Sequence, residues 1–488
     1  MKMCRFHLFT VVISLLLANS TVAKKPNILF ILVDDLGYMD VGAYNPDTFY
    51  ETPNIDRLAS EGVRFTDGYA ANPVCSPTRY SIMTGKWPSR PDATNFFSGR
   101  RGGKYASAPL HDRMDLDEIT LAEALKAKGY RTFFAGKWHL GPTEEYWPTK
   151  QGFDVNKGGW KHGGPWFGGK YFSPYKNPRL EDGPKGEHLP TRLANDTVNF
   201  IEANQDKPFL AYLSFYSVHT PLMTTPELKK KYQAKAERLG LNGKPEFAPE
   251  EQSFPGNRKR EVRILQRHAV YAGMMEAMDR AIGIVLDKLK ELKLDKDTVV
   301  CFTSDNGGLS TSEGSPTSNL PFRGGKGWTY EGGIREPFLI KWPGVVKAGR
   351  VSSVPVCSID FYPTLLEIAG VDYGHDVDGR SLVPLLKGGK APRRDALYWH
   401  YPHYSNQGGI PSGAIRMGDW KLIERYEDGR AHLYNLKNDV GERNDVAGKN
   451  GKRVGQMRAK LHRWYQEVDA KFLQPKDGNV PWAPGKGK

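Results

Sequence analysis

The strongest constraint on the fold is an uninterrupted apolar run at residues 27–33, which ends in two carboxylates, Asp34 and Asp35. A continuous run rich in branched residues is typical of a strand buried on both faces of a parallel sheet. Similar runs lie at 131–135, 209–215 and 298–303, and helical patterns separate them at 120–128, 192–204 and about 262–292. This alternation predicts an α/β fold with a doubly wound sheet, in which ligands bind at the carboxyl ends of the strands.

The pattern changes near residues 384–394. Beyond that segment, short alternating runs separated by turns predict antiparallel hairpins, and a helix at about 453–468 follows them. We therefore predict a large α/β domain at 24–390, a smaller α+β subdomain at 391–474 and a flexible tail at 475–488. Two long stretches, 158–171 and 232–260, are predicted to be irregular.

The N-terminal segment is typical of a secretion signal. Residues 1–23 combine Lys2 and Arg5 with an apolar run at 8–17 and small residues up to Ala23. The apolar run is shorter than the roughly 20 residues that a membrane span needs, so a membrane anchor is the disfavoured alternative. We expect a cleaved signal peptide and a secreted or periplasmic protein without stable membrane insertion.

Cysteine content and charge exclude some classes of protein. Of the four cysteines, Cys4 would leave with the signal; Cys301 could pair with Cys357, although its buried-strand pattern disfavours this. The formal net charge of +14 fits a polyanionic partner, but a solvated basic surface is the commoner cause. No helix-turn-helix, RNA-binding or zinc-finger pattern is present, so a nucleic-acid partner is disfavoured. The oligomeric state cannot be inferred.

The segment 75–79, Cys-Ser-Pro-Thr-Arg, combines a reactive side chain with an anion site. Pro77 suits the first position of a helix, which places Cys75 just before the helix amino end. Free N–H groups and the positive end of the helix dipole favour an anion there, and Arg79 lies one turn further on the same face. The alternative is a helix start with a buried cysteine.

Oxygen ligands follow two of the predicted strands. Asp34 and Asp35 end the first, and Asp305 and Asn306 end the strand at 298–303. Carboxylates that converge at strand ends repel one another unless a cation joins them, and oxygen ligands select Ca²⁺ or Mg²⁺ over Zn²⁺. The alternative is a helix cap at the first position and a turn at the second.

Cationic groups occupy comparable positions. Lys137 and His139 follow the strand at 131–135, and His219 follows the strand at 209–215. Lys326 lies within a glycine-rich segment, 319–337, whose glycines would allow the backbone close to a ligand. Each residue taken singly is more often structural; together they lie beyond strands that feed one sheet edge. Arg335 is interpreted as structural, paired with Glu331 or Glu336.

These segments resemble the type I, formylglycine-dependent sulfatases, and in particular arylsulfatase A-like and N-acetylgalactosamine-sulfatase-like members, including bacterial polysaccharide sulfatases. The segment 75–79 followed by Thr84 and Gly85 resembles their modification signature, and 325–333 resembles their Gly-Lys-Gly-x-x-Tyr-Glu-Gly-Gly stretch. The resemblance covers about residues 26–445. It implies an alkaline-phosphatase-like mixed sheet sandwiched by helices, with a C-terminal antiparallel sheet and helix.

The resemblance also implies a chemistry. A formylglycine-generating or anaerobic sulfatase-maturating enzyme would oxidise Cys75 to formylglycine (3-oxoalanine), whose hydrate attacks sulfur and forms a covalent sulfo-enzyme intermediate. One calcium ion would be bound by Asp34, Asp35, Asp305, Asn306 and residue 75. Arg79 would favour the deprotonated hydrate, and His139 would act on the hydrate. The sulfate would be held by Lys137, His219 and Lys326, with His219 protonating the leaving alcohol.

The implied substrate is a sulfated saccharide, such as a galactose or N-acetylgalactosamine sulfate of a polysaccharide or glycosaminoglycan. Aromatic residues at 158–171 and 399–404 suit sugar rings, although packing between the two domains explains them equally well. Candidate substrate contacts are His400, His403, Arg100 and Arg101. Two rival hypotheses are a phosphatase or phosphonate monoester hydrolase of the same superfamily, and a non-enzymatic protein that binds sulfated glycans.

Overall fold

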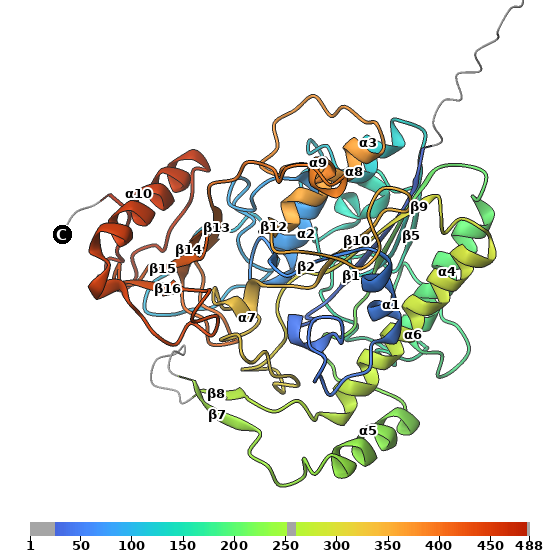
Figure 1. The fold of residues 1–488 in the computed structure, drawn as a ribbon, viewed down its shortest axis with the longest axis horizontal. Helices are drawn as coiled ribbons and strands as arrows, with labels where there is room; N and C mark the ends of the chain where they lie inside the picture. The colour runs from blue at the N-terminus through green and yellow to red at the C-terminus, as the bar shows by residue number, and fades with distance from the viewer. Residues whose placement is uncertain (1–24, 251–259, 486–488) are drawn as a thin grey trace, which may run out of the picture.

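A central mixed sheet of eight strands organises the computed structural model, which describes residues 25–250 and 260–485 (Figure 1). The strand order is β11-β2-β10-β9-β1-β6-β4-β5. In chain order these strands are β1 (Asn27–Val33), β2 (Val63–Phe65), β4 (Arg131–Gly136), β5 (Val155–Lys157), β6 (Phe209–Ser214), β9 (Thr298–Ser304), β10 (Phe338–Lys341) and β11 (Arg350–Ser352). The predicted signal peptide, 1–23, lies outside the described residues.

The first apolar run forms the middle of this sheet. Every residue of β1 is buried, and the strand pairs in parallel with β9 on one side and β6 on the other. β4 pairs in parallel with β6, whereas β10 runs antiparallel between β9 and β2. The carboxyl ends of β9, β1, β6 and β4 therefore meet at one edge of the sheet. The prediction of an α/β fold with a doubly wound mixed sheet is confirmed.

Helices cover both faces of the sheet. Successive side chains of β1 point to opposite faces, and both faces are apolar and have to be buried. Leu29 and Ile31 face one core and Ile28 and Phe30 the other. The first face is covered by α1 (Pro53–Glu61), α4 (Leu189–Ala203), α5 (Pro226–Arg238) and α6 (Ala269–Glu291). The second is covered by α2 (Cys75–Thr84), α3 (Leu121–Lys126), α8 (Phe361–Ile368) and α9 (Val383–Leu386). None of the helices in the described part of the chain has the length and apolar character of a membrane span.

A second, antiparallel sheet follows, as predicted. Its strands, in spatial order, are β13 (Leu397–Tyr401), β14 (Ser412–Met417), β15 (Trp420–Arg425) and β16 (Ala431–Asn435), and α10 (Gly451–Glu467) packs beside them (Figure 1). The predicted domain boundary at 390/391 falls between α9 and β13. A buried lysine on β15, Lys421, ties this part to the large domain through Glu331, 2.9 Å away, and also pairs with Glu442 of the small domain at 2.9 Å.

The prediction that 232–260 is irregular was wrong. The stretch 232–260 begins inside α5, where Leu228, Tyr232 and Ala236 recur at four-residue intervals and bury one face of the helix. The same stretch contains β7 (Phe247–Glu250) and reaches β8 (Arg260–Arg263). The flexibility of the tail at 475–488 stays a prediction. Within it, Trp482 packs against the core of the smaller domain, and the Arg458 guanidinium lies 5.6 Å from its ring centroid.

Smaller elements complete the fold. Two short parallel strands, β3 (Gly68–Tyr69) and β12 (Val356–Cys357), pair with each other, and α7 (Glu331–Ile334) lies within the glycine-rich segment 319–337. Cys75, Cys301 and Cys357 are free and buried, so the possible disulfide between the last two is not formed. The fold is held by its three hydrophobic cores.

Candidate functional site

The predicted site residues meet at the carboxyl edge of the large sheet. Asp34 and Asp35 follow β1, Asp305 and Asn306 follow β9, Lys137 and His139 lie at and just after the end of β4, and His219 follows β6. These four strands are neighbours in the sheet. The structure therefore brings together residues that are far apart in the sequence, while their individual roles remain predictions.

Cys75 lies at the amino end of α2, at the same edge. The helix begins at Cys75 itself and not at Pro77, because Val74 is extended and Cys75 is already helical. The thiol is buried, and burial raises its pKa above the usual value even though Lys137 and Lys326 act in the opposite direction. Residue 75 thus combines a helix amino end with two nearby ammonium groups.

His139 lies beside residue 75. Its Nδ1 lies 3.6 Å from Cys75 Sγ, and its Nε2 faces the Phe97 carbonyl oxygen at 3.3 Å. Because a carbonyl can only accept, Nε2 carries the proton and Nδ1 presents its lone pair to residue 75. Burial, reinforced by Lys137 and Arg79, lowers the pKa of His139 well below its usual value, so the ring is neutral.

Arg79 is fixed on three sides. Its Nε and Nη2 each lie 2.8 Å from Asp305 Oδ2, and its Nη1 donates to the Lys137 carbonyl at 2.9 Å and to Ser214 Oγ at 2.7 Å. Ser214 is a residue that sequence reasoning missed. The only sequence signal for it is that a hydroxyl ends the otherwise apolar β6.

Two buried ammonium groups neutralise the paired carboxylates. Lys137 Nζ lies 2.6 Å from Asp34 Oδ2, and Lys326 Nζ lies 2.9 Å from Asp35. Burial alone would raise the pKa of Asp35, but Lys326 and His219 outweigh it and lower that pKa to about 2. Burial, reinforced by Asp305 and Asp35, raises the pKa of Asp34 well above its usual value despite Lys137.

The same carboxylates fit a hard divalent cation. Ligand atoms of Asp34, Cys75 and Asp305 lie within 4.8 Å of one another. Within the described residues, Asp34 Oδ1 and Asn306 Oδ1 are buried oxygen atoms without a hydrogen-bond partner, while Asn306 Nδ2 donates to Asp35 Oδ1 at 2.8 Å. Unpaired oxygens of this kind are costly in a protein interior unless a cation takes them up.

His219 lies on the other side of Asp35. Its Nε2 is 3.7 Å from Asp35 Oδ2, and its Nδ1 donates to the Thr220 carbonyl at 2.7 Å. Burial, together with Lys326, lowers its pKa to about 4 although Asp35 acts in the opposite direction. The Trp166 ring, which is 47% exposed, stands edge-on to His219 at 5.7 Å. An aromatic side chain of the irregular 158–171 segment therefore borders the site.

The histidines proposed as substrate contacts are buried in the structure, and their contact with a substrate stays a prediction. His400 is buried, with Nδ1 2.6 Å from the Tyr426 hydroxyl and Nε2 2.8 Å from the Lys471 carbonyl, so both ring nitrogens are used. His403 is buried with Nε2 2.8 Å from Thr94 Oγ1. The partners of the His400 ring belong to the smaller domain, whereas the partner of the His403 ring, Thr94, belongs to the larger one.

The two arginines proposed as substrate contacts lie at the surface, unlike the two histidines. Arg100 and Arg101 are exposed, and Arg100 lies 3.8 Å from Asp112. Their role stays a prediction. The structural reading of Arg335 is confirmed, since it pairs with Glu331 at 3.3 Å and with Asp67 at 3.2 Å.

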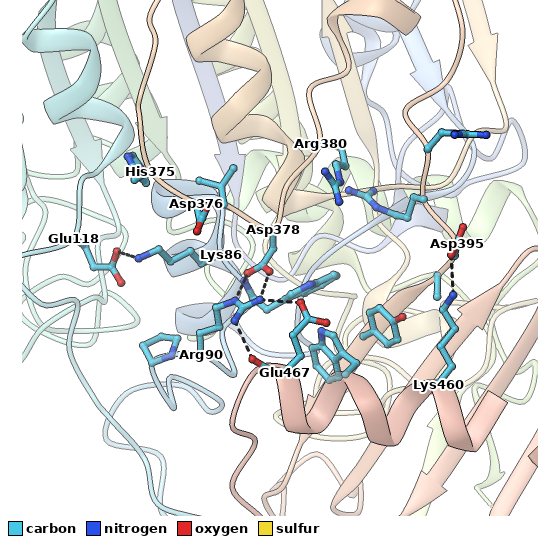
Figure 2. A pocket seen from close by; sticks show the side chains of 18 residues that line it. Lys86, Arg90, Glu118, His375, Asp376, Asp378, Arg380, Asp395, Lys460 and Glu467 are labelled. Atoms are coloured by element: carbon cyan, nitrogen blue, oxygen red, sulfur yellow. Dashed lines mark hydrogen bonds and ion pairs between the residues drawn. The ribbon is translucent and has the colours of Figure 1, made fainter. Parts of the chain in front are cut away.

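Figure 2 shows a large surface cavity, and two of its lining residues, Lys86 and Arg90, come just after the carboxyl end of α2 in the sequence. It has a volume of about 890 Å³ and lies between the large domain and α10. Three of its cations are held by ion pairs, Lys86 with Glu118, Arg90 with Asp378 and Lys460 with Asp395 (Figure 2). Because α2 rises about 15 Å from end to end, this cavity is separate from Cys75.

Comparison with known proteins agrees with this geometry. The family model described as "Sulfatase" matches residues 26–371, and the model described as "N-sulphoglucosamine sulphohydrolase, C-terminal" matches residues 324–471. A protein of Formosa agariphila described as "Sulfatase" is 31% identical over 528 residues, covering 92% of this chain and 90% of that protein. Human N-acetylgalactosamine-6-sulfatase is 33% identical over 405 residues, covering 77% and 68%.

A solved structure shares both fold and sequence. Ps i-CgsB in complex with k-i-k-neocarrahexaose superposes with a TM-score of 0.73 at 29% identity, covering 90% of this chain and 93% of that one. The family match extends over more than half of the chain and includes the whole sheet edge that carries Cys75. The chain therefore belongs to the sulfatase family and is a sulfuric ester hydrolase.

Proposed function

We propose that this sulfatase releases inorganic sulfate from a sulfated sugar, such as a galactose or N-acetylgalactosamine sulfate, within a polysaccharide or glycosaminoglycan. The observation that carries the proposal is the convergence of Cys75, two buried lysines and two neutral histidines at one sheet edge. The relatives support the substrate class. One is named for N-acetylgalactosamine 6-sulfate, and a solved neighbour is a complex with a carrageenan oligosaccharide.

In this proposal, a modified residue and a metal ion complete the site. Formylglycine made from Cys75 by a maturating enzyme supplies a nucleophilic oxygen, and a calcium ion supplies positive charge. The side chains that would hold the ion are Asp34, Asp35, Asp305 and Asn306, and the unpaired oxygens of Asp34 and Asn306 were described above. Cys75 Sγ occupies the position from which an oxygen of the modified residue would act.

Residues of this chain bind and orient the sulfate. Lys137 and Lys326 bring two buried ammonium groups into the site, and an electrostatic interaction with a buried charge is stronger than one in solution. Asp35 and Glu313 outweigh burial and raise the pKa of Lys326 well above its usual value, so this cation persists at neutral pH. Arg79, held by Asp305 and Ser214, adds a third cation at the amino end of α2.

The two histidines are suited to different proton transfers. His139, neutral and with the Nδ1 lone pair toward residue 75, can accept a proton from that residue. His219 is neutral without substrate because its pKa is about 4. An anionic sulfate ester beside it would raise that pKa, so the ring can take up a proton and donate it from Nε2 to the leaving oxygen.

Export from the cytoplasm is part of the proposal. It is supported by the charged and apolar pattern of residues 1–23.

Replacing Cys75 tests the assignment. We expect Cys75→Ala to abolish release of sulfate from sulfated saccharides while thermal unfolding and the circular dichroism spectrum stay like those of the wild type. Cys357→Ala is the matched control, since it removes another buried, free thiol outside the site. Mass analysis of the wild-type peptide should show that residue 75 has exchanged its sulfur for oxygen and lost two hydrogens.

Two outcomes would contradict the proposal. Substantial sulfate release by Cys75→Ala would remove residue 75 from the reaction. An unmodified thiol in protein from the native host, without turnover of any sulfated saccharide, would favour a glycan-binding protein. Turnover of phosphate or phosphonate esters in place of sulfate esters would favour the phosphatase hypothesis.

A further inference from the structure

One acidic residue near the cationic site, Glu313, supports the charge of Lys326 but is assigned no contact with the substrate in the proposed chemistry. Glu313 lies in the loop that follows β9 and is half-buried. Its φ is +54°, the left-handed region that side chains other than glycine rarely adopt. Backbone conformations of this kind are unfavourable and persist where the surrounding structure holds them, often at functional sites.

The loop between β13 and β14 holds the Glu313 carboxylate. Asn406 Nδ2 donates to Glu313 Oε1 at 2.6 Å, and Gln407 Nε2 donates to the same oxygen at 2.7 Å. Among the residues that the structure describes, Oε2 of Glu313 receives no hydrogen bond. One oxygen is thus fixed by two amides of the C-terminal subdomain, and the other keeps its capacity to accept.

This carboxylate lies beside the sulfate-binding cations. Gln407 packs against Gly327, the residue after Lys326. The approach is close enough that a Cβ added at Gly327 would lie 2.9 Å from Gln407 Oε1. On the other side, a Cβ at Gly314 would lie 3.7 Å from Cδ1 of Leu222, three residues beyond His219. Glu313 is therefore bracketed by the two segments that carry Lys326 and His219.

The electrostatics agree with this placement. Burial lowers the pKa of Lys326, but Asp35 and, next in size, Glu313 raise it well above its usual value. Glu313 also opposes the lowering of the His219 pKa, which burial dominates. A carboxylate in this position weakens binding of any anion nearby, so an isolated sulfate would be bound better without it.

We propose that Glu313 determines the specificity of this sulfatase. Its Oε2 accepts a hydrogen bond from a free hydroxyl next to the sulfate ester and rejects substrates that carry a second sulfate at that position. The inference rests on the proposed function, because it concerns the alcohol whose sulfate is removed. A carboxylate can only accept, and a neighbouring hydroxyl can donate whereas a sulfate monoester anion cannot.

The alternative is that Glu313 only ties the 402–411 loop to the 309–316 loop or maintains the charge of Lys326. Both alternatives predict that its replacement slows every substrate alike. A specificity role predicts that the effect depends on the group next to the sulfate. The readout is therefore the ratio of kcat/KM between matched substrates.

The experiment compares the wild type with Glu313→Gln on two pairs of substrates. The first pair is 4-nitrocatechol sulfate, which has a hydroxyl next to the sulfate, and 4-nitrophenyl sulfate, which has none. The second pair is galactose 6-sulfate and galactose 4,6-disulfate. Glutamine keeps the shape and one amide-bound oxygen but places a donor at the Oε2 position and removes the charge. Glu237→Gln, an exposed carboxylate on α5, is the control.

We expect Glu313→Gln to lower kcat/KM about 10-fold for the hydroxyl-bearing substrates, the difference between a charged and a neutral hydrogen bond. The value for 4-nitrophenyl sulfate should stay within about twofold of the wild type or rise, since an anionic neighbour is lost. The disulfate should gain relative to the monosulfate by about 10-fold or more. Glu237→Gln should change none of these ratios.

Two results overturn the inference. An equal loss on both aryl sulfates assigns Glu313 a structural or chemical role, and unchanged ratios remove it from specificity. Failure of the proposed function can be distinguished from failure of the Glu313 inference. A wild type that cleaves the aryl sulfates but no sulfated sugar refutes the saccharide substrate, while the aryl pair still decides the role of Glu313.

Discussion

Replacing Lys137 by methionine separates the contribution of a buried ion pair from that of a bound cation. Lys137 Nζ lies 2.6 Å from Asp34 Oδ2, and both side chains are fully buried. The next cation, Arg79 Nη2, is 3.9 Å from Asp34. Removal of one partner from a buried pair costs about 3–5 kcal/mol, because the remaining charge is left uncompensated. We expect a loss of this size in the free energy of unfolding when divalent cations are removed by chelation.

Calcium should restore much of that loss. A cation bound at Asp34 gives the carboxylate a new counterion, and without Lys137 the cation no longer competes with an ammonium group. A ligand that binds only the folded state stabilises it by about 2.7 kcal/mol at 100 times its Kd, and tighter binding increases this gain. Ca²⁺ should therefore raise the melting temperature of Lys137→Met more than that of the wild type. Activity should still fall about 100- to 1,000-fold at saturating Ca²⁺, since one of the cations that bind the sulfate is missing.

The assay is thermal unfolding by scanning calorimetry in EDTA and in CaCl₂, with sulfate release measured in parallel. Lys341→Met is the control, because its pair with Glu61 at 2.6 Å is partly exposed and should contribute no more than about 1 kcal/mol. An equal rise in melting temperature with Ca²⁺ for Lys137→Met and the wild type would refute the reasoning. It would show that the cation does not bind at Asp34.

Two further predictions concern proton transfer and pH. His219→Ala should lower kcat for a sugar sulfate about 100- to 10,000-fold but lower it less for 4-nitrophenyl sulfate, whose leaving group needs no proton; equal losses would contradict a role as acid. Burial dominates the pKa of Glu442 and raises it from 4.5 to about 7, so the folded state favours the protonated form. Wild-type stability should accordingly fall as pH rises from about 4.5 through about 7, and Glu442→Gln should lack this fall in urea unfolding across that range. The same pH slope in both proteins would show that Glu442 is not the titrating group.

The position of the site could be predicted because its signals are local. Asp34, Lys137 and Asp305 each follow a buried apolar run, and neighbouring parallel strands end at the same edge of a sheet. Adjacency in sequence to a strand end is therefore enough to predict proximity in space. The small antiparallel sheet could be predicted because the turns between its strands are also local signals.

Other features depend on tertiary partners that no local pattern encodes. His400 lies in a segment rich in aromatic residues, which suits a sugar site and buried packing equally, and its hydrogen bonds to Tyr426 and Lys471 join positions that are distant in the sequence. Ser214 and Glu313 are single polar residues whose importance comes from Arg79 and from the 402–411 loop. The helix α5 was missed because its many charged residues obscured a buried face of three residues.

The contacts that close the site have a consequence for how the chain folds. Asn306 donates to Asp35 across 271 residues of sequence, and Lys326 reaches the same carboxylate across 291 residues. Contacts of such long range give a high contact order, and their loop-closure entropy must be overcome before they contribute any stabilising energy. Helices such as α6 can form early, whereas the cation site requires both halves of the sheet to be assembled. Recovery of Ca²⁺ binding during refolding should therefore lag behind recovery of helical circular dichroism.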